Sequence, residues 1–175
     1  MKLIALLSLC YAIVILANPM AKLPDALRAA AGVYKTVAPN QSRAQSLNQT
    51  VLITASNFGY LNHLMNFKCF ADRLNLKFLV FAFDDRIYSA LEEHADMIVV
   101  KFTHGKKVGS EATNFRSKDF NIMSNRKFEA TLEVLKLGYD LIFADPDVVI
   151  VDDPVPTVIF PGIDYAHSIN MFCPM

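Results

Sequence analysis

The chain has 175 residues, of which 53% are hydrophobic and 19% are charged, so it carries enough apolar material for a folded domain. Lys plus Arg equals Asp plus Glu at 17 each, and no basic excess points to a nucleic acid as partner. Three cysteines are too few for a fold built on disulfides, so a hydrophobic core must supply the stability.

The first 17 residues form a segment of their own. Met1 and Lys2 precede a mainly apolar run from Leu3 to Ala17, which is shorter than the ~20 residues that usually span a bilayer. The run fits either a cleaved signal peptide or a short signal-anchor, and both send the remainder into the secretory lumen.

Residues 18–50 are predicted to be a stem or linker with a short helix near residues 24–31. The stretch is polar, and Asn40 and Asn48 each begin an N-glycosylation tripeptide. Such tripeptides are common by chance, but their place before the first strong strand fits a glycosylated stem.

From Val51 onward, apolar runs of strand length alternate with helical patterns. Strands are predicted at 51–55, 78–82, 97–100 and 141–144. Helices are predicted after the first strand, at 86–94, and before the last strand, with a long loop at 103–121. The last helix is predicted from the spacing of Phe128, Thr131, Leu132 and Leu135, and Gly138 closes it. The alternation predicts an α/β domain over residues 51–175, with a mainly parallel sheet and helices on both faces.

Ligands of such folds bind beyond the carboxyl ends of the strands, which directs attention to three stretches of this chain. These stretches are residues 54–59, 84–85 and 145–147.

The triplet Asp145-Pro146-Asp147 directly follows the last predicted strand. Two carboxylates one residue apart repel each other, and a divalent cation relieves the repulsion because hard cations prefer carboxylate oxygens. A cation held there would bridge and neutralise the phosphates of a nucleoside diphosphate. Two alternatives stay open: a solvated turn in which Asp145 caps the next segment, and the Asp-x-Asp nucleophile motif of a haloacid dehalogenase-type phosphatase. That phosphatase motif normally opens its domain, whereas here it comes late in the chain.

Five segments in order resemble the nucleotide-diphospho-sugar transferase family, typified by glycosyltransferase family 77 with the plant rhamnogalacturonan xylosyltransferases and extensin arabinosyltransferases. The resemblance runs from about Val51 to the end of the chain, and several ordered segments are more specific than the acidic triplet alone. The segments are residues 52–60 (LITASNFGY), 78–85 (FLVFAFDD), 125–130 (NRKFEA), 135–149 (LKLGYDLIFADPDVV) and 164–168 (DYAHS).

The resemblance implies a Rossmann-like GT-A fold, a manganese-dependent nucleotide-sugar donor, transfer with retention, and a type II Golgi membrane protein, or a secreted one if the N-terminal segment is cleaved. It identifies Asp145-Pro146-Asp147 with the family's DXD motif, with Asp145 and Asp147 as metal residues. Family members continue past the equivalent of residue 175, so the domain is expected to be incomplete at its C-terminus and to comprise the donor-binding part. The residues implied to contact the donor are Thr54, Ala55, Asn57, Asp84, Lys127 and Asp145.

Structural roles remain open for three of these residues. Asn57 and Asp84 each precede a predicted helix and suit its N-cap, and Lys127 suits a solvated helix surface beside Arg126. Two functions are carried forward: transfer of a sugar, most simply from a UDP-sugar, to a polysaccharide or glycoprotein acceptor, and a non-catalytic lumenal partner of a full-length transferase.

Overall fold

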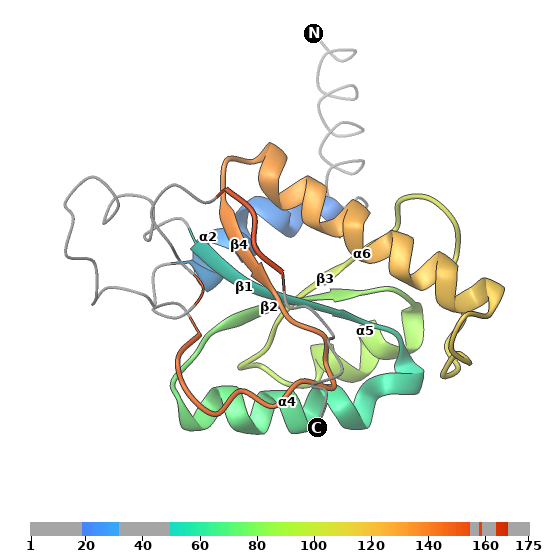
Figure 1. Ribbon diagram of the computed structural model, residues 1–175, viewed down its shortest axis with the longest axis horizontal. Helices are drawn as coiled ribbons and strands as arrows, with labels where there is room; N and C mark the ends of the chain where they lie inside the picture. The colour runs from blue at the N-terminus through green and yellow to red at the C-terminus, as the bar shows by residue number, and fades with distance from the viewer. Residues whose placement is uncertain (1–18, 32–49, 155–157, 159–163, 168–175) are drawn as a thin grey trace, which may run out of the picture.

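The computed structural model describes residues 19–31, 50–154, 158 and 164–167, which contain a four-stranded parallel sheet of order β3-β2-β1-β4 (Figure 1). The predicted α/β fold is therefore confirmed, and each predicted strand lies within one residue of its observed ends. The strands are β1 (Thr50–Ser56), β2 (Phe78–Ala82), β3 (Ile98–Lys101) and β4 (Asp140–Phe143).

Helices cover both faces of the sheet. Helices α4 (Leu61–Arg73) and α5 (Asp85–Glu92) pack on one face, and α6 (Lys118–Lys136) packs on the other. The chain steps from β1 to β2 to β3 in one direction and then crosses back to β4 on the far side of β1. Because parallel crossovers are right-handed, this reversal places α6 opposite α4 and α5.

Strand β1 is the centre of the core, and all seven of its residues are buried. Its side chains alternate between two hydrophobic clusters: Val51 and Ile53 face α6, whereas Leu52 faces α4 and α5. A strand that is covered on both faces needs apolar side chains on both faces. The continuous apolar run at residues 51–55, from which this strand was predicted, meets that need.

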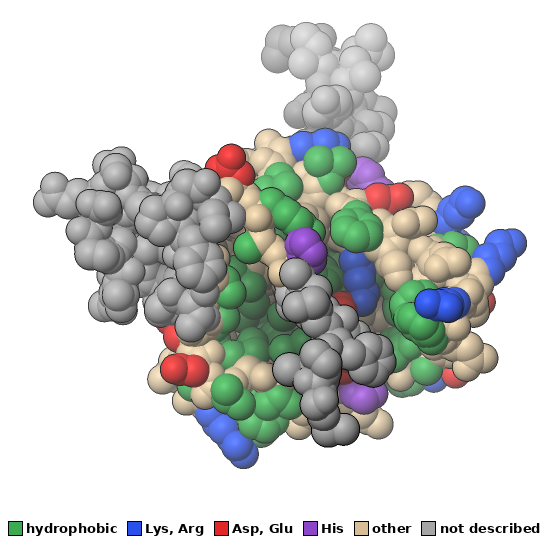
Figure 2. All heavy atoms as spheres, in the orientation of Figure 1, with side chains coloured by type: hydrophobic (Ala, Val, Ile, Leu, Met, Phe, Trp, Pro, Cys, Tyr) green, Lys and Arg blue, Asp and Glu red, His purple; other side chains and the backbone are tan. Residues whose placement is uncertain are grey.

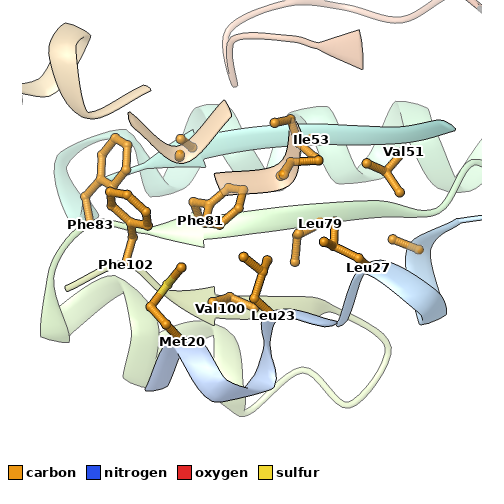
Figure 3. Close-up of a cluster of buried hydrophobic side chains, with 14 of the residues drawn as sticks. Met20, Leu23, Leu27, Val51, Ile53, Leu79, Phe81, Phe83, Val100 and Phe102 are labelled. Atoms are coloured by element: carbon orange, nitrogen blue, oxygen red, sulfur yellow. The ribbon is translucent and has the colours of Figure 1, made fainter. Parts of the chain in front are cut away.

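The helix predicted near residues 24–31 is α2 (Leu23–Ala30), preceded by the short 3-10 helix η1 (Pro19–Lys22). The helix is confirmed, but its assignment to a linker is wrong. Leu23, Leu27 and Ala30 are buried at 2%, 0% and 0% exposure against the side chains of β1, β2 and β3 (Figure 3). The folded part of the described chain therefore begins at Pro19, because this helix covers the part of the face that α6 leaves open.

Helix α6 is confirmed, but its large apolar side chains do not face the sheet. Phe128, Leu132 and Leu135 are 72%, 49% and 51% exposed. The buried positions are Met123, Arg126, Ala130 and Val134. The sequence pattern of large apolar side chains predicted the wrong face of α6. The face that packs on the sheet carries one methionine, one arginine and two smaller apolar residues.

Arg126 is only 3% exposed, and aromatic and ionic contacts explain how a charge lies there. Its guanidinium carbon lies 4.6 Å from the centroid of the Phe102 ring, and its Nη1 pairs with Glu129. Such stacking and pairing compensate part of the desolvation of a guanidinium.

One further expectation needs correction. The predicted loop at 103–121 ends earlier, because α6 begins at Lys118 with the Ser117 hydroxyl accepting from the Phe120 amide at 3.1 Å. Gly138 has φ = +79° at the end of α6, as predicted for a C-terminal glycine.

No helix in residues 19–31 or 50–154 is long and apolar enough to cross a membrane. The N-terminal segment 1–17 and both glycosylation tripeptides lie outside the described residues, so these predictions stay as they are.

Candidate donor-binding site

The reversal of strand order between β1 and β4 creates a topological switch point, the usual ligand position in open α/β sheets. Ile53 of β1 pairs with Phe143 of β4, so Asp145 lies about level with Ala55. Asn57 and Asp84 follow β1 and β2 at the same edge. The topology thus brings together the three sequence stretches that were predicted to surround a ligand.

The side of the molecule at edge strand β4 is less covered than the centre of the sheet. Among the four residues of β4, Asp140 is exposed and Leu141 to Phe143 are only half-buried. Figure 2 shows hydrophobic side chains near the middle of this side of the molecule. The carboxyl end of β4 is therefore accessible.

The acidic triplet forms a tight turn at that end. The Val148 amide donates to the Asp145 carbonyl at 3.1 Å, which places Pro146 at the second position of a four-residue turn. Pro146 is buried, Asp145 is half-exposed and Asp147 is exposed. The proline ring fixes the backbone, and both carboxylates remain accessible.

The Lys127 ammonium pairs with the Asp145 carboxylate, joining α6 to the turn. The side chain of Lys127 is 21% exposed and that of Asp145 is 47% exposed. The alternative of a solvated Lys127 is wrong, because this lysine is paired with Asp145; its predicted contact with a donor stays a prediction.

The donor set available for a cation at this turn is small. No group of three or more His, Cys, Asp or Glu side chains in the described residues could hold a metal ion, so the predicted metal site is not confirmed. A cation that serves diphosphate chemistry usually takes one or two carboxylates, several waters and the phosphates. Asp145 and Asp147 are two carboxylates of the kind that such a cation uses.

Asp84 is confirmed as the N-cap of α5. Its Oδ1 accepts from the amides of Arg86 at 2.9 Å and Ile87 at 3.2 Å. The same oxygen accepts from the Ser110 hydroxyl at 3.0 Å, and Oδ2 accepts from the Phe58 amide at 2.8 Å. These bonds occupy both oxygens, so Asp84 organises the edge of the sheet; direct contact with a donor stays a prediction.

Asn57, Thr54 and Ala55 lie inside this edge. Asn57 has no exposed surface, and its side chain makes no helix-cap hydrogen bond, so the capping alternative is wrong. Thr54 and Ala55 lie within β1 at 0% and 1% exposure. In this structure the three residues are buried at this edge of the sheet, and their predicted contact with the nucleoside is untested.

Sequence reasoning missed residues 109–113, which contact the carboxyl end of β1. Tyr60 and Asn57 hydrogen-bond to this segment. A loop without periodicity gives no signal for its partners. The neighbouring Gly59, however, is a hint of close backbone approach.

The comparisons agree with this geometry. The family model for nucleotide-diphospho-sugar transferases matches residues 74–173, more than half of the chain.

The chain belongs to the nucleotide-diphospho-sugar transferase family.

This transferase-family chain is also similar to the beta-arabinofuranosyltransferase RAY1 of Arabidopsis thaliana. The two are 30% identical over 110 residues, which is 62% of this chain and 20% of the relative. The chain thus spans about a fifth of the relative's length. No solved structure gives a significant match.

A surface cavity of about 430 Å³ lies at the opposite edge of the transferase sheet. Lys68 and Asp72 of α4 line it together with Asp96, which precedes β3. Since donors bind at carboxyl ends of strands, this cavity at the amino ends is not the donor site.

The Lys68 ammonium joins Asp72 at 2.6 Å and Asp96 at 2.5 Å across that cavity. The hydrogen bond from Lys68 lowers the pKa of Asp96 below its usual 3.8. A lowered folded-state pKa stabilises the protein above the unfolded pKa, and this contribution disappears as pH falls through the folded value.

Asp96→Asn is therefore expected to lower the free energy of unfolding at pH 7, with a difference from wild type that begins to shrink as pH falls below the usual 3.8 and disappears only below the lower folded-state pKa of Asp96. Denaturant unfolding across pH 3 to 7 measures it, and Glu93→Gln, a change at an exposed acid outside the cluster, is the control. A difference that persists unchanged to pH 3 would contradict the ion-pair explanation.

Proposed function

We propose that this chain forms the donor-binding part of a glycosyltransferase that moves a sugar from a nucleoside-diphosphate donor to a polysaccharide or glycoprotein. The observation that carries the proposal is the acidic turn Asp145-Pro146-Asp147 at the switch point of a transferase-family sheet. A UDP-sugar is the first donor to test, and the name of the Arabidopsis relative favours a pentose.

Asp145 and Asp147 are the residues that would hold a divalent cation, Mn²⁺ first. When bound, such a cation would neutralise the negative charge that develops on the departing diphosphate. Asp147 is exposed and can bind directly. Asp145 is half-exposed and remains near Lys127, which suits a looser contact through water or the ribose.

Lys127 has two tasks in this proposal. Its ammonium compensates the Asp145 carboxylate before a donor arrives, which limits the repulsion between the two aspartates. Once a donor is bound, the same ammonium lies close enough to the turn to donate to a diphosphate oxygen. Lys127 thus keeps the acidic turn in place and contributes positive charge to the donor pocket.

We extend the proposal to topology and stereochemistry on the resemblance alone. The transfer retains the anomeric configuration, and the domain lies in the Golgi lumen, either anchored through residues 1–17 or secreted after their cleavage.

Titration of the full chain with UDP, with Mn²⁺ or with EDTA, tests the proposal by calorimetry. UDP is expected to bind at least about tenfold tighter with Mn²⁺, which corresponds to about 1.4 kcal/mol. UMP, which lacks the second phosphate, is the matched ligand and should lose most of that difference. Equal binding of UDP with and without metal would contradict the mechanism, and no UDP binding at all would contradict the function.

A further inference from the structure

Segment 109–113 is held to the end of β1 by the side chain of Asn57. The Nδ2 group donates to the Gly109 carbonyl at 2.7 Å and to the Glu111 carbonyl at 2.8 Å. The Oδ1 atom is buried and has no hydrogen-bond partner among the described residues. A buried acceptor without a partner is unfavourable, so the position of this amide calls for an explanation.

Two more side chains fasten the same segment. The Tyr60 hydroxyl donates to the Thr113 carbonyl at 3.1 Å and accepts from the Thr113 amide at 3.2 Å. Ser110 donates its hydroxyl to the Asp84 carboxylate. The segment is thus bound at three points, by residues that follow β1 and β2.

The backbone of the segment also passes directly over Gly59. A Cβ atom at Gly59 would lie 2.1 Å from the Ala112 amide nitrogen, well inside contact distance. The path of the segment is therefore fixed by backbone contact and by hydrogen bonds together.

We propose that Asn57 and Tyr60 are positioning residues, which hold segment 109–113 as one wall of the donor site. The proposal rests on the proposed function. Asn57 has no exposed surface and both hydrogens of its amide are engaged, so it acts on a donor through the segment. Gly109, Glu111 and Ala112 are exposed, and they lie on the other side of β1 from the acidic turn.

Tyr60→Phe tests this role, because it removes the hydroxyl that hydrogen-bonds to the main chain and side chain of Thr113 and keeps the ring. UDP affinity in Mn²⁺ is expected to fall about tenfold, and amide hydrogen exchange at 109–113 should become faster. Tyr139→Phe is the matched control, because it makes the same change at a half-buried tyrosine next to the amino end of β4, and its UDP affinity should stay within about twofold of wild type. UDP should also protect the amides of 109–113 in the wild type.

A residue that merely stabilises the fold would lower the unfolding temperature and leave UDP affinity unchanged well below that temperature. Ser110→Ala removes a different bond to the segment and decides the matter if Tyr60→Phe fails to fold; it is expected to weaken UDP about threefold. Wild-type UDP affinity in folded Tyr60→Phe, or in Ser110→Ala should Tyr60→Phe not fold, would overturn the positioning role alone. Absence of UDP binding by the wild type would overturn the proposed function and this role with it.

Discussion

Asp147→Ala is expected to weaken UDP binding in Mn²⁺ by about a hundredfold, or about 2.7 kcal/mol, and to leave binding in EDTA unchanged. Asp147 is exposed and makes no packing contact with the core clusters, so the free energy of unfolding should change by no more than about 0.5 kcal/mol. Calorimetry with each variant, together with denaturant unfolding, measures both quantities.

Asp152→Ala is the matched control, because it removes the same charge from an exposed position five residues later. Its UDP affinity should be that of the wild type. Equal loss in both variants would mean that general negative charge, and not the acidic turn, supports binding. Full metal-dependent binding by Asp147→Ala would remove this residue from the proposed site.

Gly59→Ala is expected to destabilise the protein by about 3 kcal/mol. The added Cβ would lie 2.1 Å from the Ala112 nitrogen and 2.5 Å from the Glu111 carbonyl carbon, and both contacts are with backbone. No side-chain rotation relieves them, so segment 109–113 or the start of α4 must move. Denaturant unfolding measures the loss of stability.

Gly109→Ala gives a clean comparison within the same region. A Cβ at Gly109 meets nothing within 4 Å, and its φ does not require glycine. Its stability should stay within about 0.5 kcal/mol of wild type. If Gly59→Ala were tolerated equally well, the close approach of segment 109–113 to Gly59 would be wrong.

The strands and their order along the chain could be read from the sequence because each is a short apolar run that a doubly covered sheet requires. A second rule, that ligands bind beyond the carboxyl ends of parallel strands, led to the prediction that Asp145, Asn57 and Asp84 lie at one edge of the sheet. These inferences use local pattern and topology alone, which is why they succeeded.

The failures share a different cause, since they depend on what packs against an element. Leu23 and Leu27 belong to a short helix whose core role shows only when the open part of one sheet face is known. On α6, a buried Arg126 and an exposed Phe128 invert the usual reading, because Phe102 offers an aromatic face to the guanidinium. In both cases the burial of a residue depends on the element that packs against it, which the local sequence does not show.

The site shows the same division. The acidic turn follows from sequence spacing, whereas the bonds from Asn57 and Tyr60 to segment 109–113 join residues more than 50 positions apart. No periodicity encodes such pairs. The sequence therefore predicts the edge of the sheet at which a donor would bind, and the structure adds how segment 109–113 is held at that edge.

Anomalous scattering from crystals grown with Mn²⁺ and UDP tests the central claim most directly. We expect a manganese peak next to the Asp147 carboxylate, within bonding distance of a diphosphate oxygen, and a nucleoside beyond the carboxyl ends of β1 and β4. Manganese or UDP bound away from residues 145–147 would contradict it.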